Sequence, residues 1–137
     1  MTAYVIRDLR PEDHDAVYRF LSEEAYWSQG EPREIFDRSV ANSLTFAAYT
    51  GEDLVGFARV VTDRATFAWL CDVFVLAEHR GNGVSKLLMD AVMADPDLAR
   101  VRNFMLATRD AHGLYAKYGF APPAEPDRWM VIRRPYR

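Results

Sequence analysis

The sequence is poor in cysteine and has no long apolar run, and both absences limit where the protein can work. Its one cysteine, Cys71, cannot form a disulfide within the chain, which fits a reducing compartment. No stretch approaches the roughly 20 consecutive apolar residues of a membrane-spanning helix. The first residues also lack the basic region and apolar core of a secretory signal. We expect a cytoplasmic protein with no membrane partner.

Histidine is scarce as well. The three histidines, His14, His79 and His112, do not lie at metal-ligand spacing from a cysteine or a carboxylate cluster, so we expect no metal site. The net charge is -3, with acidic and basic residues interspersed. This balance argues against a nucleic-acid partner and is compatible with a cationic substrate.

Length and apolar content indicate a folded protein. The chain has 137 residues, of which 50% are hydrophobic and 13% aromatic, which is enough to bury a core. No internal repeat, low-complexity run or linker interrupts it. We therefore expect a single domain over residues 1–137.

The stretch at residues 72–86 organises the rest of the sequence. An apolar, β-prone run ends at Val75, a glycine-rich turn follows, and a helix with one apolar face begins at Val84. Gly81 and Gly83 lack the Cβ atoms that would keep a ligand from the backbone. The first amides of the helix have no partner within it, so they point outward with the positive end of the helix dipole. The turn therefore predicts an anion site, to which Arg80 would add a positive charge.

The glycines alone complete neither the dinucleotide fingerprint nor the P-loop spacing. The turn Arg80-Gly81-Asn82-Gly83-Val84-Ser85 instead resembles the R-x-x-G-x-G/A turn of the GNAT family, the acyl-CoA-dependent N-acyltransferases. One position departs from that pattern, because Ser85 stands where the family usually has glycine or alanine. We expect its small side chain to be tolerated.

A second segment carries the same resemblance. Residues 113–120, Gly-Leu-Tyr-Ala-Lys-Tyr-Gly-Phe, are similar to the [FL]-Y-x-K-x-G-F signature that the family has on a later helix. Two signatures in the right order make the resemblance far more specific than the glycines alone. It covers most of the chain.

The order of segments predicts an α/β fold with a mixed sheet of about six strands. Strand patterns occupy residues 4–8, 44–50, 54–62, 65–75, 103–108 and 127–132, and helical patterns occupy residues 11–24, 33–42, 84–92 and 111–118. A turn at residues 51–53 predicts a hairpin, and the helix between the fourth and fifth strands predicts that these two are parallel neighbours. The resemblance implies the GNAT fold, with the order β-α-α-β-β-β-α-β-α-β.

The resemblance also implies where acetyl-CoA would bind. The two parallel strands would splay apart, and the pantetheine arm would pair with the backbone of Phe74 and Val75, one of whose amides would face the thioester carbonyl. The pyrophosphate would lie on the turn formed by Arg80, Gly81, Asn82, Gly83, Val84 and Ser85. Lys86 and Arg109 are expected to be solvated, with the 3'-phosphate of coenzyme A as an alternative partner.

Acyl transfer to an amine needs a proton acceptor for the amine and a proton donor for the departing thiolate. Tyr115 matches the family's tyrosine general acid, although a half-buried helix aromatic is the alternative interpretation. Asp72, a charged residue within an apolar strand, is the first candidate for the base. His112 and Glu24 are weaker candidates, and a water relay would need none of them.

Aromatic residues are the candidates for the acceptor pocket. Tyr26 and Trp27 lie in a predicted loop and could hold an amine, or could simply pack in the core. Trp129 lies in the predicted last strand, where we favour core packing.

The leading interpretation is an N-acetyltransferase that moves the acetyl group of acetyl-CoA to a primary amine of a small molecule or a peptide. A catalytically silent acyl-CoA-binding regulatory domain is the first alternative. A nucleotide-binding module, which would bind ATP or NAD in preference to coenzyme A, is the second. Relatives often dimerise, so a homodimer is a further candidate, although no feature of the sequence specifies it.

Overall fold

The computed structural model describes residues 3–136, and within them five strands form one mixed sheet in the order β1-β2-β3-β4-β5. The strands are β1 (Val5–Arg7), β2 (Leu44–Thr50), β3 (Asp53–Thr62), β4 (Phe67–Val75) and β5 (Asn103–Leu106). The first four pair antiparallel in sequence order, and β5 pairs parallel with β4. The predicted hairpin and the predicted parallel pair are both confirmed.

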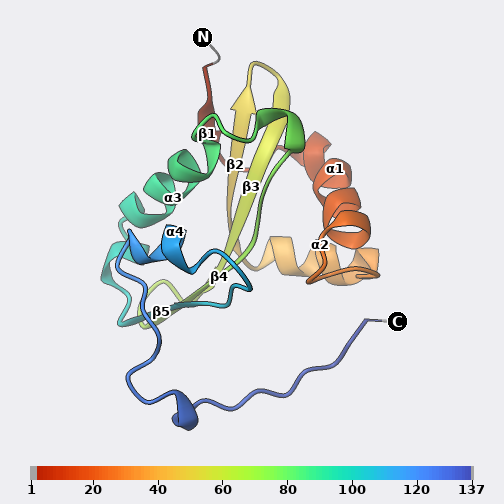
Figure 1. Ribbon diagram of the computed structural model, residues 1–137. Helices are drawn as coiled ribbons and strands as arrows, with labels where there is room; N and C mark the ends of the chain where they lie inside the picture. The colour runs from red at the N-terminus through yellow and green to blue at the C-terminus, as the bar shows by residue number, and fades with distance from the viewer. Residues whose placement is uncertain (1–2, 137) are drawn as a thin grey trace.

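Helices cover both faces of this sheet (Figure 1). They are α1 (His14–Arg19), α2 (Arg33–Ala41), α3 (Val84–Ala94) and α4 (His112–Ala116). The core under α3 and α4 includes Leu88, Val60 and Tyr115, whereas the core under α1 and α2 includes Phe36 and Phe57. None of the helices in the described range is long and apolar enough to cross a membrane.

The helices lie close to where the sequence predicts them, although α4 ends at Ala116, two residues before the predicted end. A 3-10 turn at Pro11–Asp13 leads into α1, which continues as a π-helical turn at Phe20–Glu24. Helix α3 follows Gly83, whose φ of 81° is left-handed, and ends before Asp95. The Asp95 carboxylate accepts hydrogen bonds from the amides of Asp97 and Leu98, which turns the chain back toward β5.

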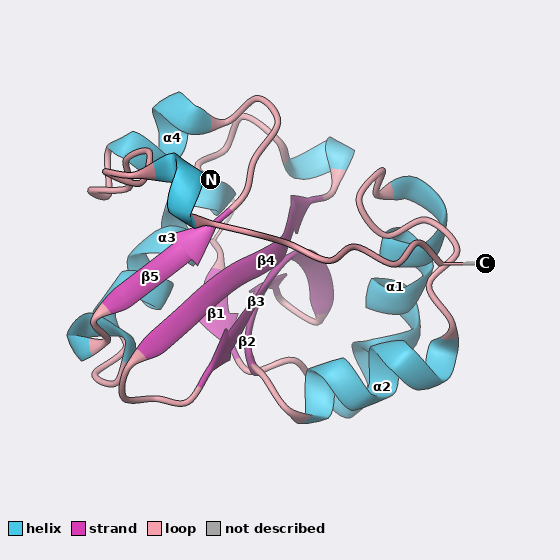
Figure 2. Ribbon diagram, turned by 90° about the horizontal axis from the view of Figure 1, so that it is seen from below, coloured by secondary structure: helices cyan, strands magenta, loops and turns pink. Residues whose placement is uncertain are grey.

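The prediction of a last strand at residues 127–132 is wrong. A 3-10 turn at Pro126–Arg128 is followed by a chain that pairs with no strand of the described structure and runs below the sheet toward the α2 side (Figures 1 and 2). The expected core position of Trp129 is wrong for the same reason, since 52% of its surface is exposed. A β-prone pattern specifies a strand only where a neighbouring strand is available, and the chain does not bring this segment to one.

Candidate active site

The glycine turn has the conformation of an anion site. Gly81 and Gly83 have φ values of 82° and 81°, a left-handed region that side chains disfavour. The first backbone bond of α3 runs from the Leu87 amide to the Gly83 carbonyl, so the amides before Leu87 have no α-helical acceptor. A Cβ added at either glycine would meet no described atom within 4 Å, which leaves the outer side of the turn open.

Arg80 joins this turn to the end of β4. Its Nε donates a hydrogen bond of 2.9 Å to the Val75 carbonyl, and the residue remains exposed. The Asn82 amide nitrogen donates to the His79 carbonyl at 3.2 Å. These two bonds tie the turn to the end of β4 and to the residue just before Arg80.

Strand β4 carries a bulge next to the turn. Phe57 of β3 faces Phe74, but Arg59 faces Cys71, so Ala58 is opposite two residues, Asp72 and Val73. Asp72 is in the left-handed region, with φ of 56°. A bulge adds a residue to one strand, bends it and shifts the facing of its side chains.

The bulge coincides with the point where β4 and β5 separate. Their pairing ends at Leu70 and Leu106, whereas β4 continues to Val75 (Figure 2). The amide of Leu76, just after β4, donates to the Val55 carbonyl on the β3 side. Since backbone groups alternate between the two edges of a strand, the amides of Val75 and Val73 point toward the gap. The predicted splay of the two parallel strands is therefore present.

A cleft of about 390 Å³ occupies this gap. Its walls come from the loop after α1, the bulged part of β4, the segment after β5, and α4. The lining residues are Tyr26, Trp27, Trp69, Leu70, Cys71, Asp72, Val73, Leu106, Ala107, Thr108, Asp110, Ala111, Tyr115 and Arg133. The structure thus brings Tyr115, Asp72, Tyr26 and Trp27 into one cleft, at the end of the strand that leads to the glycine turn.

Tyr115 reaches the cleft from α4. The residue is 9% exposed, and Phe120 packs against its ring edge-to-face, with 6.2 Å between ring centroids. Burial raises the pKa of the Tyr115 hydroxyl, and the neighbouring Tyr26 raises it further. The hydroxyl therefore remains protonated at neutral pH, as a proton donor must.

Asp72 is held in a buried ion pair. Its Oδ2 accepts a hydrogen bond of 2.8 Å from Arg59 Nε, and its Oδ1 accepts one of 3.0 Å from Trp27 Nε1. The Asp72 and Arg59 side chains are only 9% and 15% exposed. Both carboxylate oxygens are thus engaged with protein groups, an arrangement that suits holding Trp27 and Arg59 in place.

A second carboxylate lies in the same region. Glu31 is 5% exposed, and its Oε1 accepts a long hydrogen bond of 3.4 Å from the Tyr136 hydroxyl. Its Oε2 is buried and has no hydrogen-bond partner among the described residues. Burial raises the pKa of Glu31, and Asp72 raises it further while Arg59 lowers it. Two carboxylates and one guanidinium leave this acidic cluster, Glu31, Arg59 and Asp72, with an excess of negative charge when both acids are ionised.

Cys71 lies beside the acidic cluster. Burial is the main cause that raises the pKa of its thiol to about 12, with Arg59 acting in the opposite direction. The thiol therefore stays protonated and is a poor nucleophile at neutral pH.

The other candidate residues either lie outside the cleft lining or contact other protein groups. The Arg109 guanidinium stacks on the ring of Tyr26, 3.9 Å from its centroid, so it is not simply solvated. Lys86 is exposed and paired with Asp90 at 2.9 Å. His112 and Glu24 are exposed and are not among the residues that line the cleft.

Sequence reasoning missed Arg59, Glu31 and Val73. Arg59 could have been found, because a charged residue within an apolar strand needs a buried partner and Asp72 is one. Val73 was missed because the bulge, not the local pattern, decides which amides face the gap. Glu31 carries no local signal. Within residues 3–136, no three His, Cys, Asp or Glu side chains are arranged to hold a metal ion.

The known proteins that this chain resembles are described as acetyltransferases. The model of the acetyltransferase (GNAT) family matches residues 6–120. A Xanthomonas campestris pv. campestris structure, described as an acetyltransferase of the GNAT family, is 47% identical, with a TM-score of 0.94 over 98% of this chain and 96% of that chain. A Gibberella zeae protein that carries the name of an acetyltransferase is 31% identical over 75% of this chain and 70% of its own length. A Clostridium acetobutylicum acetyltransferase solved with acetyl-CoA shares the fold, at 14% identity and a TM-score of 0.72 over 96% of both chains.

Proposed function

The chain belongs to the GNAT family of acetyltransferases, and from that premise we propose that it transfers the acetyl group of acetyl-CoA to a primary amine of a small molecule or a peptide. The observation that carries this proposal is the cleft between β4 and β5, into which Tyr115 projects and toward which the Val73 and Val75 amides point. We place the reaction in the cytoplasm, with no role for a membrane, a nucleic acid or a metal.

The donor would lie along the open edge of β4. Its pyrophosphate would accept hydrogen bonds from the amides of Gly81, Asn82, Gly83, Val84 and Ser85, next to the Arg80 guanidinium. A neighbour of the same fold was crystallised with acetyl-CoA, which supports this choice of donor. The pantetheine arm would then reach Val75 and Val73. Of the two amides expected to face the thioester carbonyl, those of Phe74 and Val75, the strand alternation favours Val75. The Phe74 side chain stacks on Phe20 at 4.0 Å in the core under α1 and α2.

The acceptor would enter from the side of Tyr26 and Trp27. Arg109 already covers one face of the Tyr26 ring, so the Trp27 ring is the aromatic surface that would attract a cation. The negative charge of the acidic cluster would attract an ammonium group as well. A cationic amine therefore fits this side of the cleft better than an anionic or a neutral acceptor.

The amine nitrogen would attack the thioester carbonyl carbon directly, the carbon–sulfur bond would break, and Tyr115 would protonate the departing thiolate. An acyl-cysteine intermediate is disfavoured, because the Cys71 thiol stays protonated at neutral pH. The amine must lose a proton before it attacks. With both Asp72 oxygens engaged, we propose that Asp72 orients Trp27 and that water carries this proton out of the cleft.

The test is to incubate the purified protein with acetyl-CoA and a panel of primary amines, including polyamines, amino acids and a lysine peptide, while measuring release of the coenzyme A thiol. Amine-dependent release that Tyr115→Phe abolishes would support the proposal. Binding of acetyl-CoA without release for any amine would support the silent regulatory domain instead. Preferential binding of ATP or NAD would support the nucleotide-binding module.

A further inference from the structure

Two opposite charges line the cleft without a partner of their own. Asp110 lies just before α4, and Arg133 comes from the chain after α4. Among residues 3–136, no basic side chain lies within 4.0 Å of the Asp110 carboxylate and no acidic one lies within 4.0 Å of the Arg133 guanidinium. Asp72, the third charged residue of the lining, is instead paired with Arg59. Asp110 and Arg133 therefore do not neutralise each other, although both line the same cleft.

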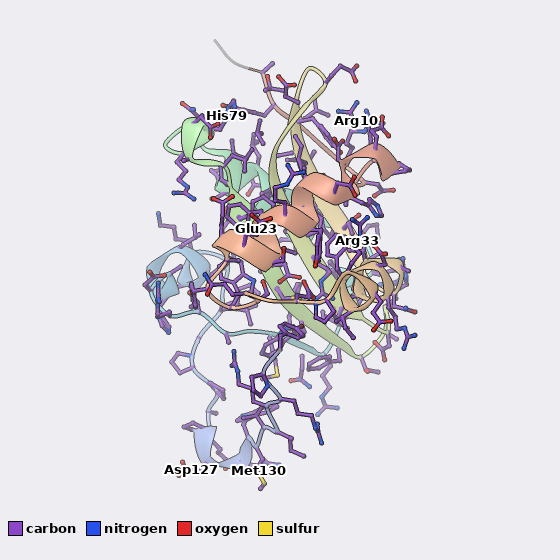
Figure 3. The ribbon with its side chains drawn as sticks, turned by 90° about the vertical axis from the view of Figure 1, so that its right-hand side faces the viewer. Arg10, Glu23, Arg33, His79, Asp127 and Met130 are labelled. Carbon is purple, nitrogen blue, oxygen red and sulfur yellow. The ribbon has the colours of Figure 1, made fainter. Side chains whose placement is uncertain are left out.

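Arg133 reaches the cleft because the tail, residues 121–136, returns to the molecule. The tail first leaves the sheet and helices, so that Asp127 and Met130 lie at the far end of the molecule (Figure 3). It then runs below the sheet toward the α2 side (Figure 2). Arg133 belongs to this returning part and lines the cleft together with residues of the loop after α1.

The returning part of the tail is attached at Tyr136. Its hydroxyl donates a hydrogen bond of 3.4 Å to Glu31 Oε1, and its Cβ lies 3.9 Å from the place where a Cβ on Gly30 would be. Glu31 is a member of the acidic cluster. The contact of Tyr136 thus connects the position of Arg133, three residues earlier, to the acidic side of the cleft.

The charges of the lining specify a ligand with two charges of opposite sign. Asp110 and the acidic cluster suit an ammonium group, whereas Arg133 suits an anion. A guanidinium presents its N–H donors in a fork that matches the two oxygens of a carboxylate. A phosphate dianion fits less well, because Asp72 and Asp110 line the same cleft and would repel its second charge.

The volume of the cleft limits the size of this ligand. At about 390 Å³ it lies toward the lower end of the range for small-molecule sites. The acetyl end of the donor would take part of this space. The remaining volume suits a small molecule better than a peptide.

We propose that the acceptor is a small amine that also carries a carboxylate, as an amino acid does, and that Arg133 binds this carboxylate. Asp110 attracts the amino group, and Tyr136 is a positioning residue for Arg133. This inference rests on the proposed function and narrows its acceptor. The ammonium group stays on the acidic side of the cleft, and the carboxylate is added at Arg133.

The test compares pairs of amines that differ only by a carboxylate: alanine with ethylamine, ornithine with putrescine, and lysine with cadaverine. The KM of each amine is measured at saturating acetyl-CoA, and its Kd is measured separately by NMR titration without acetyl-CoA. In wild type, the carboxylate member of at least one pair should have KM and Kd values about 10-fold lower than its partner, the scale of a hydrogen-bonded charge. O-phosphoethanolamine and ethanolamine form a further pair, which tests a phosphate in place of the carboxylate.

Four variants assign the preference to residues. Arg133→Gln should remove it, by raising the KM of the carboxylate amine about 10-fold and slightly lowering that of its partner, because Arg133 repels an ammonium group. The matched control is Arg134→Gln, which removes the same charge from the next residue, also exposed but outside the cleft lining. Asp110→Asn should weaken both members of a pair. Tyr136→Phe removes the hydroxyl that contacts Glu31, and it should reduce the preference by a smaller factor than Arg133→Gln.

A wild type without a preference in any pair would overturn the inference, and so would a preference that survives Arg133→Gln or is lost equally in Arg134→Gln. A lower KM for O-phosphoethanolamine than for every carboxylate amine would also overturn it, since Arg133 would then serve a phosphate. Absence of thiol release with every amine would instead refute the proposed function. The Kd values from NMR would still decide whether the cleft prefers amines that carry a carboxylate.

Discussion

The cofactor side and the acceptor side of the cleft are built in opposite ways. The proposed cofactor side comes from one continuous stretch, residues 73–85, and presents mainly backbone amides. The acceptor side is assembled by side chains from distant parts of the chain, with Trp27, Arg59 and Asp72 held together by two hydrogen bonds. On the proposed function, the first side recognises a constant ligand through local backbone geometry. The second side is shaped by side-chain contacts that can change without disturbing the first.

Because the two sides are built differently, a substitution should be able to impair one of them without impairing the other. Backbone amides at a helix start need only the turn that displays them. A buried ion pair needs both partners, because the survivor of a lost pair is an uncompensated buried charge. Substitutions on one side should therefore leave binding on the other side nearly unchanged.

The largest effect is expected at Tyr115, which lies between the two sides. Tyr115→Phe should lower kcat by about 1,000-fold, the usual scale for loss of a general acid, while acetyl-CoA affinity stays unchanged. Tyr118→Phe is the matched control, because the Tyr118 hydroxyl contacts Asp90 on the exposed side of the same segment. Steady-state kinetics and calorimetry give the two readings. Full activity in Tyr115→Phe would remove this residue from the mechanism.

Replacement of Arg59 should destabilise the acceptor side of the cleft. Arg59→Met leaves Asp72 buried without its charge partner, which should lower the free energy of unfolding by about 3 kcal/mol. Arg33→Met is the control, since Arg33 pairs with Asp15 and Asp37 at the surface, where such pairs contribute less than about 1 kcal/mol. Urea denaturation measures both. Acetyl-CoA affinity in the folded fraction should not change, and a large change would contradict the separation of the two sides.

Replacement of Gly83 should weaken acetyl-CoA binding on the cofactor side. Gly83→Glu brings a carboxylate to the proposed pyrophosphate position and should weaken acetyl-CoA binding by about 100-fold, or ~2.7 kcal/mol. Gly51→Glu introduces the same side chain at another left-handed glycine, with φ of 58°, in the hairpin turn far from the cleft. Calorimetry on both variants separates loss of the site from backbone strain. Equal losses in the two would show that the turn does not bind the donor.

The smallest effect is expected at Glu31, and it depends on pH. Because burial raises the pKa of Glu31 in the folded state, its protonated form is stabilised by folding, and this stabilisation is lost as the pH rises through the folded pKa. Glu31→Gln keeps a neutral side chain at every pH. The variant should therefore match wild type below about pH 4 and exceed its stability at pH 8, where wild type carries the cost of an ionised carboxylate in a buried site. Unfolding curves at the two pH values measure the gain, and a gain that is independent of pH would contradict the assignment.

The comparison of the two sides also explains what could be predicted from the sequence. Strand β2 was predicted at its observed bounds, and α3 was predicted to begin at Val84, because apolar periodicity and turn glycines are local signals. The parallel pairing of β4 and β5 followed from a general rule of connection.

The features that sequence reasoning missed all depend on contacts between residues far apart in the chain. The pair formed by Arg59 and Asp72 depends on strand register, and the position of Glu31 depends on how the loop after α1 folds over the sheet. The exposure of Trp129 depends on the path of the tail, which local propensity does not fix. The conformation of the glycine turn was therefore predictable from local signals, whereas the contacts of Asp72 and Glu31 on the acceptor side were not.

The most direct test of the account is an amide NMR titration with acetyl-CoA. The account predicts that the largest shifts fall on two groups of amides, those of Val73 and Val75 at the gap and those of Gly81 to Ser85 at the turn. Nucleotide fragments that lack the pantetheine arm should shift only the second group. Shifts at the turn alone for intact acetyl-CoA, or none at either group, would contradict the claim that the gap between β4 and β5 holds the acyl donor.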